Sequence, residues 1–240
     1  MTYCVGLLLN EGMVLLSDTR TNAGLDNIAT YRKMFHFENK GERVITIMTA
    51  GSLSVSQTAI ARLREALEAP DANEETSILL APTMLKVAEI VGDTLADVRR
   101  EIDEKLSMAQ GASASMIVAG QRRGGAMRMF LIYPEGNFIE ATEDTPFLQI
   151  GEHKYGKPIL DRVVRPETSL SDAQKAVLLS MDSTLRSNLS VGMPLDLCVI
   201  RKDDCCVSST RRIEAGDDAF RTMSEEWSKA LRDGFAQIRI

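Results

Sequence analysis

Two apolar runs joined by a short polar turn open the chain, and no other feature constrains its fold as strongly. Residues 2–9 and 13–17 have the length and the largely apolar character of buried strands. Asn10-Glu11-Gly12 between them is typical of a tight turn. We therefore expect a hairpin that returns the end of the second run to the beginning of the first, so that Asp18 lies near Thr2.

Thr2 is a candidate nucleophile because of its position. If Met1 is removed, the hydroxyl and the α-amine belong to one residue, and an α-amine with a pKa of about 7.7 to 8 can accept the hydroxyl proton directly or through one water. Small residues at position 2 permit removal of Met1 in cells, and we expect no signal peptide before the first strand. We expect a processed N-terminus, although a threonine at position 2 is by itself an ordinary small residue.

A single lysine enters the next strand-like segment. Residues 29–37 resume an alternating pattern, and Lys33 lies among them. A lysine ammonium beside the Thr2 hydroxyl would favour its ionised form, and the Asp18 carboxylate would hold the lysine in place. Residues 44–50 then form an apolar run that is closed by Gly51.

These positions together form a pattern that resembles a known family. Thr2, Asp18-x-Arg20, Lys33-Met34 and Thr49-Ala50-Gly51 resemble the proteasome β-subunit family of N-terminal nucleophile hydrolases. The opening Thr-Tyr-Cys-Val-Gly, residues 20–28 and residues 149–156 are most similar to Anbu, the bacterial proteasome-like branch of that family. The likeness extends over essentially the whole chain and is strongest near its beginning.

The resemblance implies a role for each matching position. Thr2 would be the nucleophile with its own amine as the proton acceptor, Lys33 would lower the barrier electrostatically, and Asp18 would orient Lys33. The backbone N–H of Gly51 would face the oxyanion, a donor whose loss typically costs roughly 3 to 4 kcal/mol of transition-state stabilisation. The resemblance also assigns three residues to substrate binding: Thr49, Arg20 and Asn188. Thr49 would shape the pocket for the side chain before the cleaved bond.

Two stretches depart from the family pattern. Where active relatives carry Asp-x-x-Ser-Gly, this chain has Asn188-Leu189-Ser190-Val191-Gly192, so an amide replaces the acid and the serine is shifted. We expect Ser190 to substitute as a catalytic residue. The usual serine-glycine-serine turn is replaced by Gly151-Glu152-His153-Lys154, which lacks a supporting hydroxyl. These departures bear on the rate more than on the fold.

Composition favours a cytoplasmic globular enzyme. The 240 residues are 44% hydrophobic and contain no Pro-, Gly- or Ser-rich linker, so we predict one domain over residues 1–240, which the resemblance implies is proteasome β-subunit-like. With 28 basic and 34 acidic residues the net charge is −6, which argues against nucleic acid and against a membrane surface as partners. The four cysteines lack metal-ligand spacing, and we expect no metal site and no cofactor.

The remaining periodicity predicts the architecture. Apolar residues recur at helical intervals in residues 54–67, 83–106, 157–164 and 171–186. Short strand-like runs occupy residues 115–120, 128–133, 138–141, 146–150, 194–201 and 206–213. This order predicts an α+β fold with two stacked sheets covered by helices on both sides, and the resemblance implies a four-layer αββα sandwich.

Two minor features complete the pattern. Residues 217–239 carry an apolar stripe at helical spacing that either caps the core or docks on a neighbouring subunit, and we expect packing within the subunit. His36 and His153 are the only histidines, so a Ser-His-Asp triad is not expected, and His36 should be a strand residue with a hydrogen-bonded imidazole.

Three functions remain open. The first is a threonine-type endopeptidase or amide hydrolase acting on a peptide or protein within a homo-oligomer that encloses its sites. The second is a weakly active or non-catalytic assembly subunit, and the third is an amidase acting on a small non-protein peptide. The resemblance also implies an ATP-dependent unfoldase or co-encoded peptide-modifying enzymes as partners. Whether the assembly is closed, open or helical is not specified by the sequence.

Overall fold

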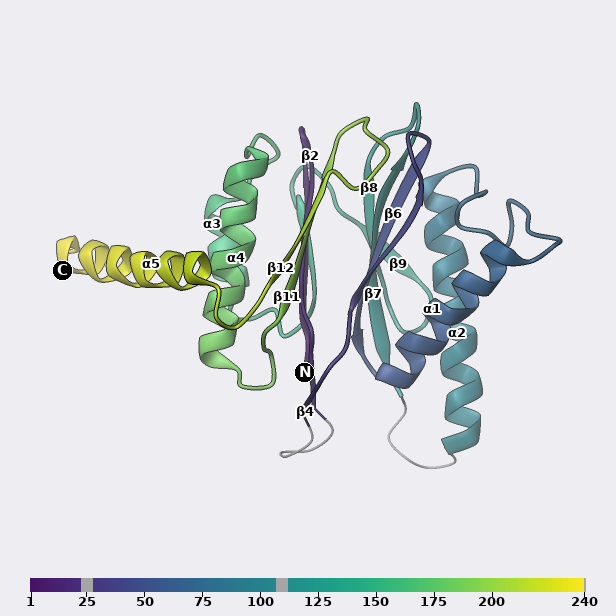
Figure 1. Cartoon of the computed structure of the whole chain (residues 1–240), viewed down its shortest axis with the longest axis horizontal. Helices are drawn as coiled ribbons and strands as arrows, with labels where there is room; N and C mark the ends of the chain where they lie inside the picture. Colours follow the sequence, from purple (N-terminus) through teal and green to yellow (C-terminus); the bar gives the residue numbers. More distant parts are fainter. Residues whose placement is uncertain (23–27, 107–111, 240) are drawn as a thin grey trace.

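A computed structural model describes residues 1–22, 28–106 and 112–239 of the chain. Two five-stranded antiparallel sheets lie face to face, and helices cover the outer face of each (Figure 1). The architecture is therefore the α+β sandwich of four layers that the sequence predicts.

The first sheet contains the predicted N-terminal hairpin. Its strands are, in spatial order, β10 (Phe147–Gly151), β1 (Tyr3–Leu9), β2 (Gly12–Asp18), β11 (Leu195–Arg201) and β12 (Ser209–Ile213). Cys4 lies opposite Ser17 and Leu9 opposite Gly12, so the hairpin prediction is confirmed. On its other side, β1 pairs with β10, where Tyr3 lies opposite Gly151.

The second sheet follows the chain order. Its strands are β5 (Met34–Asn39), β6 (Arg43–Gly51), β7 (Ala114–Arg122), β8 (Arg128–Ile132) and β9 (Phe138–Glu140). A separate small hairpin pairs β3 (Arg20–Asn22) with β4 (Ile28–Thr30) at the lower end of the sandwich (Figure 1).

The helices lie where their apolar stripes require. Helices α1 (Leu53–Glu68) and α2 (Met84–Leu106) cover the second sheet, and α3 (Lys157–Val163) and α4 (Leu170–Ser187) cover the first (Figure 1). The hydroxyl of Ser169 accepts a hydrogen bond from the backbone N–H of Asp172 and so caps the beginning of α4. All four helices agree with the predicted ranges to within two residues.

Three hydrophobic clusters fill the spaces between the layers. In β6, Ile45 and Ile47 pack toward α1 and α2, while Val44 and Met48 pack toward the first sheet. Both faces of this strand are therefore buried, which explains its continuous apolar sequence.

The segment around Lys33 differs from the expectation. Residues 29–37 do not form one strand, because β4 ends at Thr30 and β5 begins at Met34. The backbone there bonds to two other segments: Tyr31 N–H donates to the Thr19 carbonyl and Thr49 N–H to the Lys33 carbonyl, both at 2.9 Å. The polar composition of residues 21–27 predicts a loop after β2; that prediction is wrong for Thr21 and Asn22, which belong to β3, and residues 23–27 lie outside the described residues.

Helix α5 (Asp218–Gln237) projects away from the body of the molecule (Figure 1). Its first turns contact α4, and Phe220 packs against the core of the first sheet. Further along, Leu231 and Phe235 are 53% and 79% exposed. The expectation that the whole stripe packs within the subunit is therefore wrong for its second half. No helix in the described part of the chain has the length and apolar character needed to cross a membrane.

Candidate active site

Asp18 occupies the end of β2, beside the beginning of β1, and its side chain is fully buried. Oδ1 accepts hydrogen bonds from Lys33 Nζ at 2.8 Å and from the backbone N–H of Tyr3 at 3.1 Å, and Oδ2 accepts one from the N–H of Gly192 at 3.3 Å. Burial raises the pKa of the Asp18 carboxyl above its ordinary value, and the Lys33 ammonium and the two backbone donors oppose that shift.

Lys33 reaches this carboxylate from the break between β4 and β5. Its ammonium donates to Asp18 Oδ1 and, at 2.6 Å, to the backbone carbonyl of Arg20, and the residue is 5% exposed. Because two oxygen acceptors fix the ammonium, its position is determined by the end of β2 and by β3 together.

Lys33 also lines a cavity of about 110 Å³, which Asp18 does not reach. Thr2, Lys33, Thr49 and Gly51 all line it, so four of the eight predicted site residues share one space. The others in its wall are Met1, Thr21, Ala50, Leu53 and Ser56.

Gly51 ends β6 with a positive φ of 103°. A Cβ atom at this position would lie 2.3 Å from the carbonyl oxygen of Ser113, so neither the backbone conformation nor the space admits a side chain. The main chain is therefore exposed at the edge of the cavity, where a substrate could approach it closely.

The N-terminal amine belongs to Met1 in this structure. Met1 is 61% exposed and lines the cavity, whereas Thr2 is 8% exposed. Burial, followed by the Lys33 charge, lowers the pKa of the α-amine, and Asp18 and Glu152 oppose that shift. A lowered pKa favours the neutral amine, which is the form that can accept a proton.

Glu152 is a site residue that the sequence reasoning missed. Its backbone N–H donates to the Thr2 carbonyl at 2.7 Å, and its carboxylate accepts a hydrogen bond from the Asn188 amide at 3.1 Å. Gly151, just before it, packs so tightly that an added Cβ would lie 1.9 Å from the Thr2 carbonyl oxygen. The signal was the acidic residue in the turn that departs from the family pattern.

Asn188, Arg20 and Ser190 lie beside the cavity and not among the residues that line it. The Asn188 amide contacts Glu152 and lies 3.9 Å from the Met1 sulfur. The Arg20 guanidinium donates to the Leu189 carbonyl at 3.0 Å, and the N–H of Ser190 donates to Asn188 Oδ1 at 2.9 Å. These contacts hold the turn that presents the Gly192 N–H to Asp18; the assigned substrate and catalytic roles stay predictions.

Two hydroxyl groups in the cavity wall were also missed. Thr21 belongs to β3, which was expected to be loop, and Ser56 belongs to the first turn of α1, where its hydroxyl donates to the Ser52 carbonyl at 2.8 Å. Nothing in the sequence around Thr21 or Ser56 distinguishes it from the other threonines and serines of the chain. Among the described residues, no group of three or more His, Cys, Asp or Glu side chains is placed to hold a metal ion.

Comparison with known proteins supplies the family. A family model described as proteasome subunit matches residues 2–200. The structure of an Anbu (Gly-1) mutant from Hyphomicrobium sp. strain MC1 is 48% identical, with a TM-score of 0.93 over 100% of this chain and 99% of that chain.

Two further solved structures agree. The helical assembly of the Anbu complex from Pseudomonas aeruginosa is 42% identical, with a TM-score of 0.92 over 99% of this chain and 97% of that chain. Anbu, described as an ancestral β-subunit, from Yersinia bercovieri is 39% identical, with a TM-score of 0.91 over 99% and 98% of the two chains. A search of curated proteins gave no match. The chain therefore belongs to the proteasome subunit family, within its Anbu branch.

Proposed function

We propose that this chain is an N-terminal threonine hydrolase that cleaves peptide or amide bonds after Met1 has been removed. The observation that carries the proposal is the buried Lys33–Asp18 pair, whose lysine lines a cavity that Thr2 and Gly51 share. Burying two charges is costly and gives a fold little net stability, so an ion pair kept at this place is better explained by chemistry than by packing.

The proposed reaction proceeds in two halves. The neutral α-amine of Thr2 takes the hydroxyl proton as Oγ1 attacks the substrate carbonyl carbon, and the Gly51 N–H stabilises the oxyanion. The amine then gives its proton to the leaving nitrogen, the C–N bond breaks, and an ester to Thr2 remains. In the second half, water attacks the ester and gives a proton to the amine, the C–O bond to Thr2 breaks as the amine returns that proton to Oγ1, and the carboxylic acid product leaves.

Glu152 and Asn188 are proposed to hold the amine during this cycle. After removal of Met1 the amine belongs to Thr2, which is buried and whose carbonyl already accepts the Glu152 N–H. The Glu152 charge acts on the Met1 amine in the direction that favours its protonated form, and the same carboxylate, oriented by the Asn188 amide, is proposed to act on the Thr2 amine. This pair would supply the negative charge that the family pattern places at residue 188, and Ser190 would support the turn.

The substrate is proposed to be a peptide, a protein segment or a small non-protein peptide. The relative from Pseudomonas aeruginosa forms a helical assembly, which supports a homo-oligomer for this chain. A cytoplasmic location and a partnership with an ATP-dependent unfoldase or peptide-modifying enzymes are parts of the proposal that only the family likeness supports.

One observation favours the alternative of a weakly active or non-catalytic assembly subunit. Met1 lines the cavity, and a chain that kept it would place the wrong residue's amine beside the Thr2 hydroxyl. Retention of Met1 would therefore disable the proposed nucleophile without affecting the fold.

Intact-mass measurement combined with a peptide epoxyketone separates these possibilities. We expect a mass that lacks Met1 and addition of the probe to Thr2, since the probe requires both a hydroxyl and a free α-amine. Thr2→Ala should fold and resist the probe, and Thr30→Ala, which changes an exposed threonine of β4, should label normally. A mass that includes Met1, or a processed protein that the probe does not modify, would favour the assembly subunit.

A further inference from the structure

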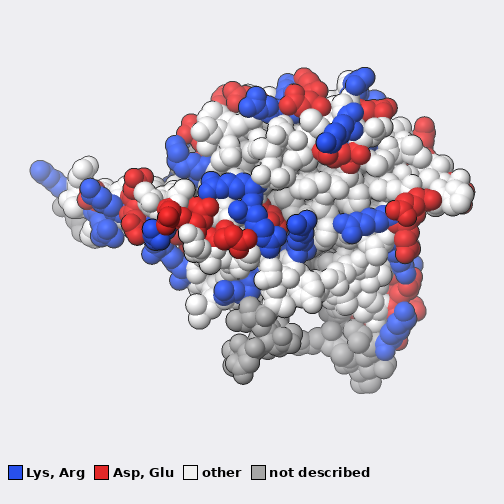
Figure 2. Space-filling model, in the orientation of Figure 1, with Lys and Arg blue, Asp and Glu red and all other residues white. Residues whose placement is uncertain are grey.

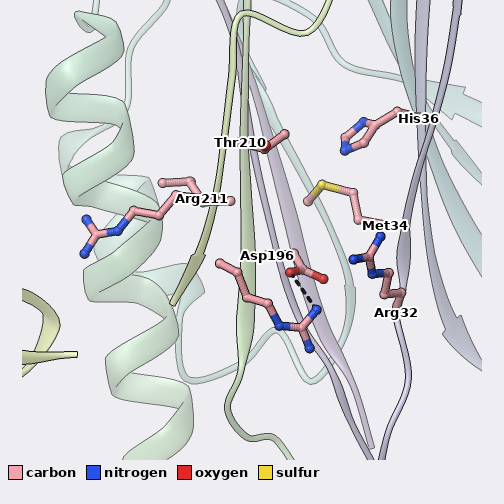
Figure 3. Close-up of a pocket in the computed structure, with 8 residues that line it drawn as sticks. Arg32, Met34, His36, Asp196, Thr210 and Arg211 are labelled. Carbon is pink, nitrogen blue, oxygen red and sulfur yellow. Dashed lines mark hydrogen bonds and ion pairs between the residues drawn. The ribbon is translucent and has the colours of Figure 1, made fainter. Parts of the chain in front are cut away.

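A second cavity, of about 180 Å³, lies where the edges of the two sheets face each other. Strand β5 is an edge strand of the second sheet and β12 an edge strand of the first, and the cavity lies between them (Figure 3). We refer to it as the edge crevice; its lining residues are Arg32, Met34, His36, Asp196, Leu197, Thr210, Arg211 and Arg212. None of them lines the Thr2 cavity.

Arg32 gives the edge crevice an unused cation. Among the described residues, its guanidinium has no partner within hydrogen-bond or ion-pair distance, although its charge acts on both His36 and Asp196. It extends from the end of the segment before β5 toward Asp196 (Figure 3). A guanidinium carries five N–H donors in a planar fork, and this one directs them at the crevice without an acceptor.

Arg212 on the opposite wall is only loosely paired. It lies 3.4 Å from Asp196 Oδ1 and 3.4 Å from Glu214 Oε1, beyond the usual range of a charge-assisted hydrogen bond. Arg128 shows what full pairing gives on this surface, because its Nε and Nη2 both lie 2.6 Å from the Glu140 carboxylate. The guanidinium groups of Arg32 and Arg212 therefore both retain N–H donors that could bind a ligand.

Two further lining residues, His36 and Arg211, have hydrogen-bond or ion-pair partners of their own. The Nδ1 of His36 lies 2.9 Å from the Thr46 hydroxyl, and no bond of its Nε2 to another described residue is present. Arg211 turns away from the crevice (Figure 3) and pairs with Asp217 at 2.7 Å. Arg212 faces two carboxylates, those of Asp196 and Glu214, so among the described residues Arg32 is the one guanidinium lining the crevice that has no carboxylate partner.

Figure 2 shows basic side chains across the centre of this face, with acidic side chains beside them. An unpaired guanidinium at the mouth of a cleft attracts small anions. The floor is apolar, because Met34 and Leu197 are each 5% exposed.

We infer that the edge crevice binds a small aliphatic monocarboxylate. The carboxylate would lie between Arg32 and Arg212, accepting N–H donors from both walls, and the hydrocarbon body would cover Met34 and Leu197. A single negative charge matches the one unpaired guanidinium, that of Arg32, whereas a phosphate dianion would meet stronger repulsion from Asp196 and Glu214. Since a dry cavity of roughly 150 Å³ holds benzene, about six to eight heavy atoms fit here.

The carboxylate could belong to a free acid or to the end of a short peptide. Isovalerate represents the first source and N-acetyl-leucine the second; the carboxylate, Cα and side chain of the latter would fill the crevice, and its acetamido group would extend out of it, where a peptide chain would continue. Binding of either supports the inference. Isovaleramide and N-acetyl-leucinamide have nearly the same shapes without the charge. The site is independent of the proposed hydrolase function, because the Thr2→Ala protein should bind these ligands as well as the native chain does.

Titration calorimetry on the full-length chain tests the inference, with Arg32→Gln and Arg212→Gln as variants and Arg211→Gln as the matched control. We expect saturable binding of at least one carboxylate, at least tenfold weaker binding in the first two variants, and unchanged binding in the third. Arg32 is exposed and unpaired, so its variant should fold even if that of Arg212 does not. Equal binding of the amides, tighter binding of inorganic phosphate, an equal loss in Arg211→Gln, or no saturable binding of either acid overturns the inference.

Discussion

Replacing Lys33 by Met removes the ammonium of the buried pair while keeping a side chain of similar length. The Asp18 carboxylate then remains fully buried with only the N–H groups of Tyr3 and Gly192, at 3.1 and 3.3 Å, to stabilise its charge. The Arg20 carbonyl also loses the donor that lies 2.6 Å away. The variant therefore keeps the shape of the site and loses its charge compensation.

The expected loss follows from that burial. Removing one partner of a buried ion pair destabilises a protein by about 3 to 5 kcal/mol, which is roughly two to four powers of ten in the folding equilibrium. Without Lys33 the pKa of Asp18 rises further above its ordinary value of 3.8, because the largest opposing charge is gone. The folded variant then holds a proton that the unfolded chain has released, so its stability falls as pH rises above 3.8, and the loss should grow from pH 4 to pH 7.

Urea unfolding followed by far-UV circular dichroism at fixed protein concentration measures this loss. Lys175→Met is the matched control, because Lys175 pairs with Asp172 at 2.7 Å with both side chains about 60% exposed, and its removal should change stability only slightly. The double variant Lys33→Met, Asp18→Asn should recover most of the loss, since no buried charge remains. Equal effects of Lys33→Met and Lys175→Met, or a loss that does not change with pH, would refute the reasoning.

Three further predictions concern neighbouring groups. Glu152→Gln should lower the pKa of the N-terminal α-amine, because the Glu152 charge raises that pKa. The pH dependence of amine acylation measures the shift, and an unchanged pKa would show that Glu152 does not act on the amine. Burial raises the pKa of Tyr3 to about 12, so the folded chain keeps a proton that the unfolded chain loses and stability should fall from pH 10 to 12. In Tyr3→Phe that alkaline fall should be smaller in urea unfolding; an identical fall contradicts the assignment. Gly51→Ala should lower the free energy of unfolding by more than the roughly 1–2 kcal/mol that a positive φ costs, because its Cβ would also clash with the Ser113 carbonyl oxygen. Gly124→Ala, which has open space at φ 72°, should cost only that amount in the same assay. Equal losses would show that the backbone around Gly51 adapts to the added side chain.

Regular elements were predictable where local periodicity and burial agree. Helices α1 and α2 follow from apolar residues every three to four positions, and β1, β2 and β6 follow from short apolar runs bounded by turns or by glycine. These signals depend only on which face of a helix or strand packs against the core, and the order of apolar and polar residues along the chain specifies that face.

Helix α5 shows the limit of that signal. Its apolar stripe resembles that of α1, yet Leu231 and Phe235 are exposed because none of the described layers extends far enough to cover them. Periodicity states that a face is apolar and does not state whether a partner surface exists. The prediction of intramolecular packing was therefore wrong for the second half of the helix.

The candidate site divides in the same way. Thr2, Asp18 and Lys33 were identified from residue type and order, since a hydroxyl, an acid and a lysine on neighbouring strands suggest one chemistry. The position of Lys33 in a break between strands, fixed by the Arg20 carbonyl, was not predictable, because backbone hydrogen bonds between distant segments leave no local pattern. Glu152 became visible only through its contacts with Thr2 and Asn188.

By itself the sequence determined the layers of this protein and the residue types available for chemistry, because hydrophobic periodicity and chemical identity are local properties of the chain. The tertiary structure decided which of those residues share a cavity, which charges are buried, and which face remains uncovered. Those properties depend on distances between segments that lie far apart along the chain. The Lys33–Asp18 pair and the edge crevice between β5 and β12 both arise at this level.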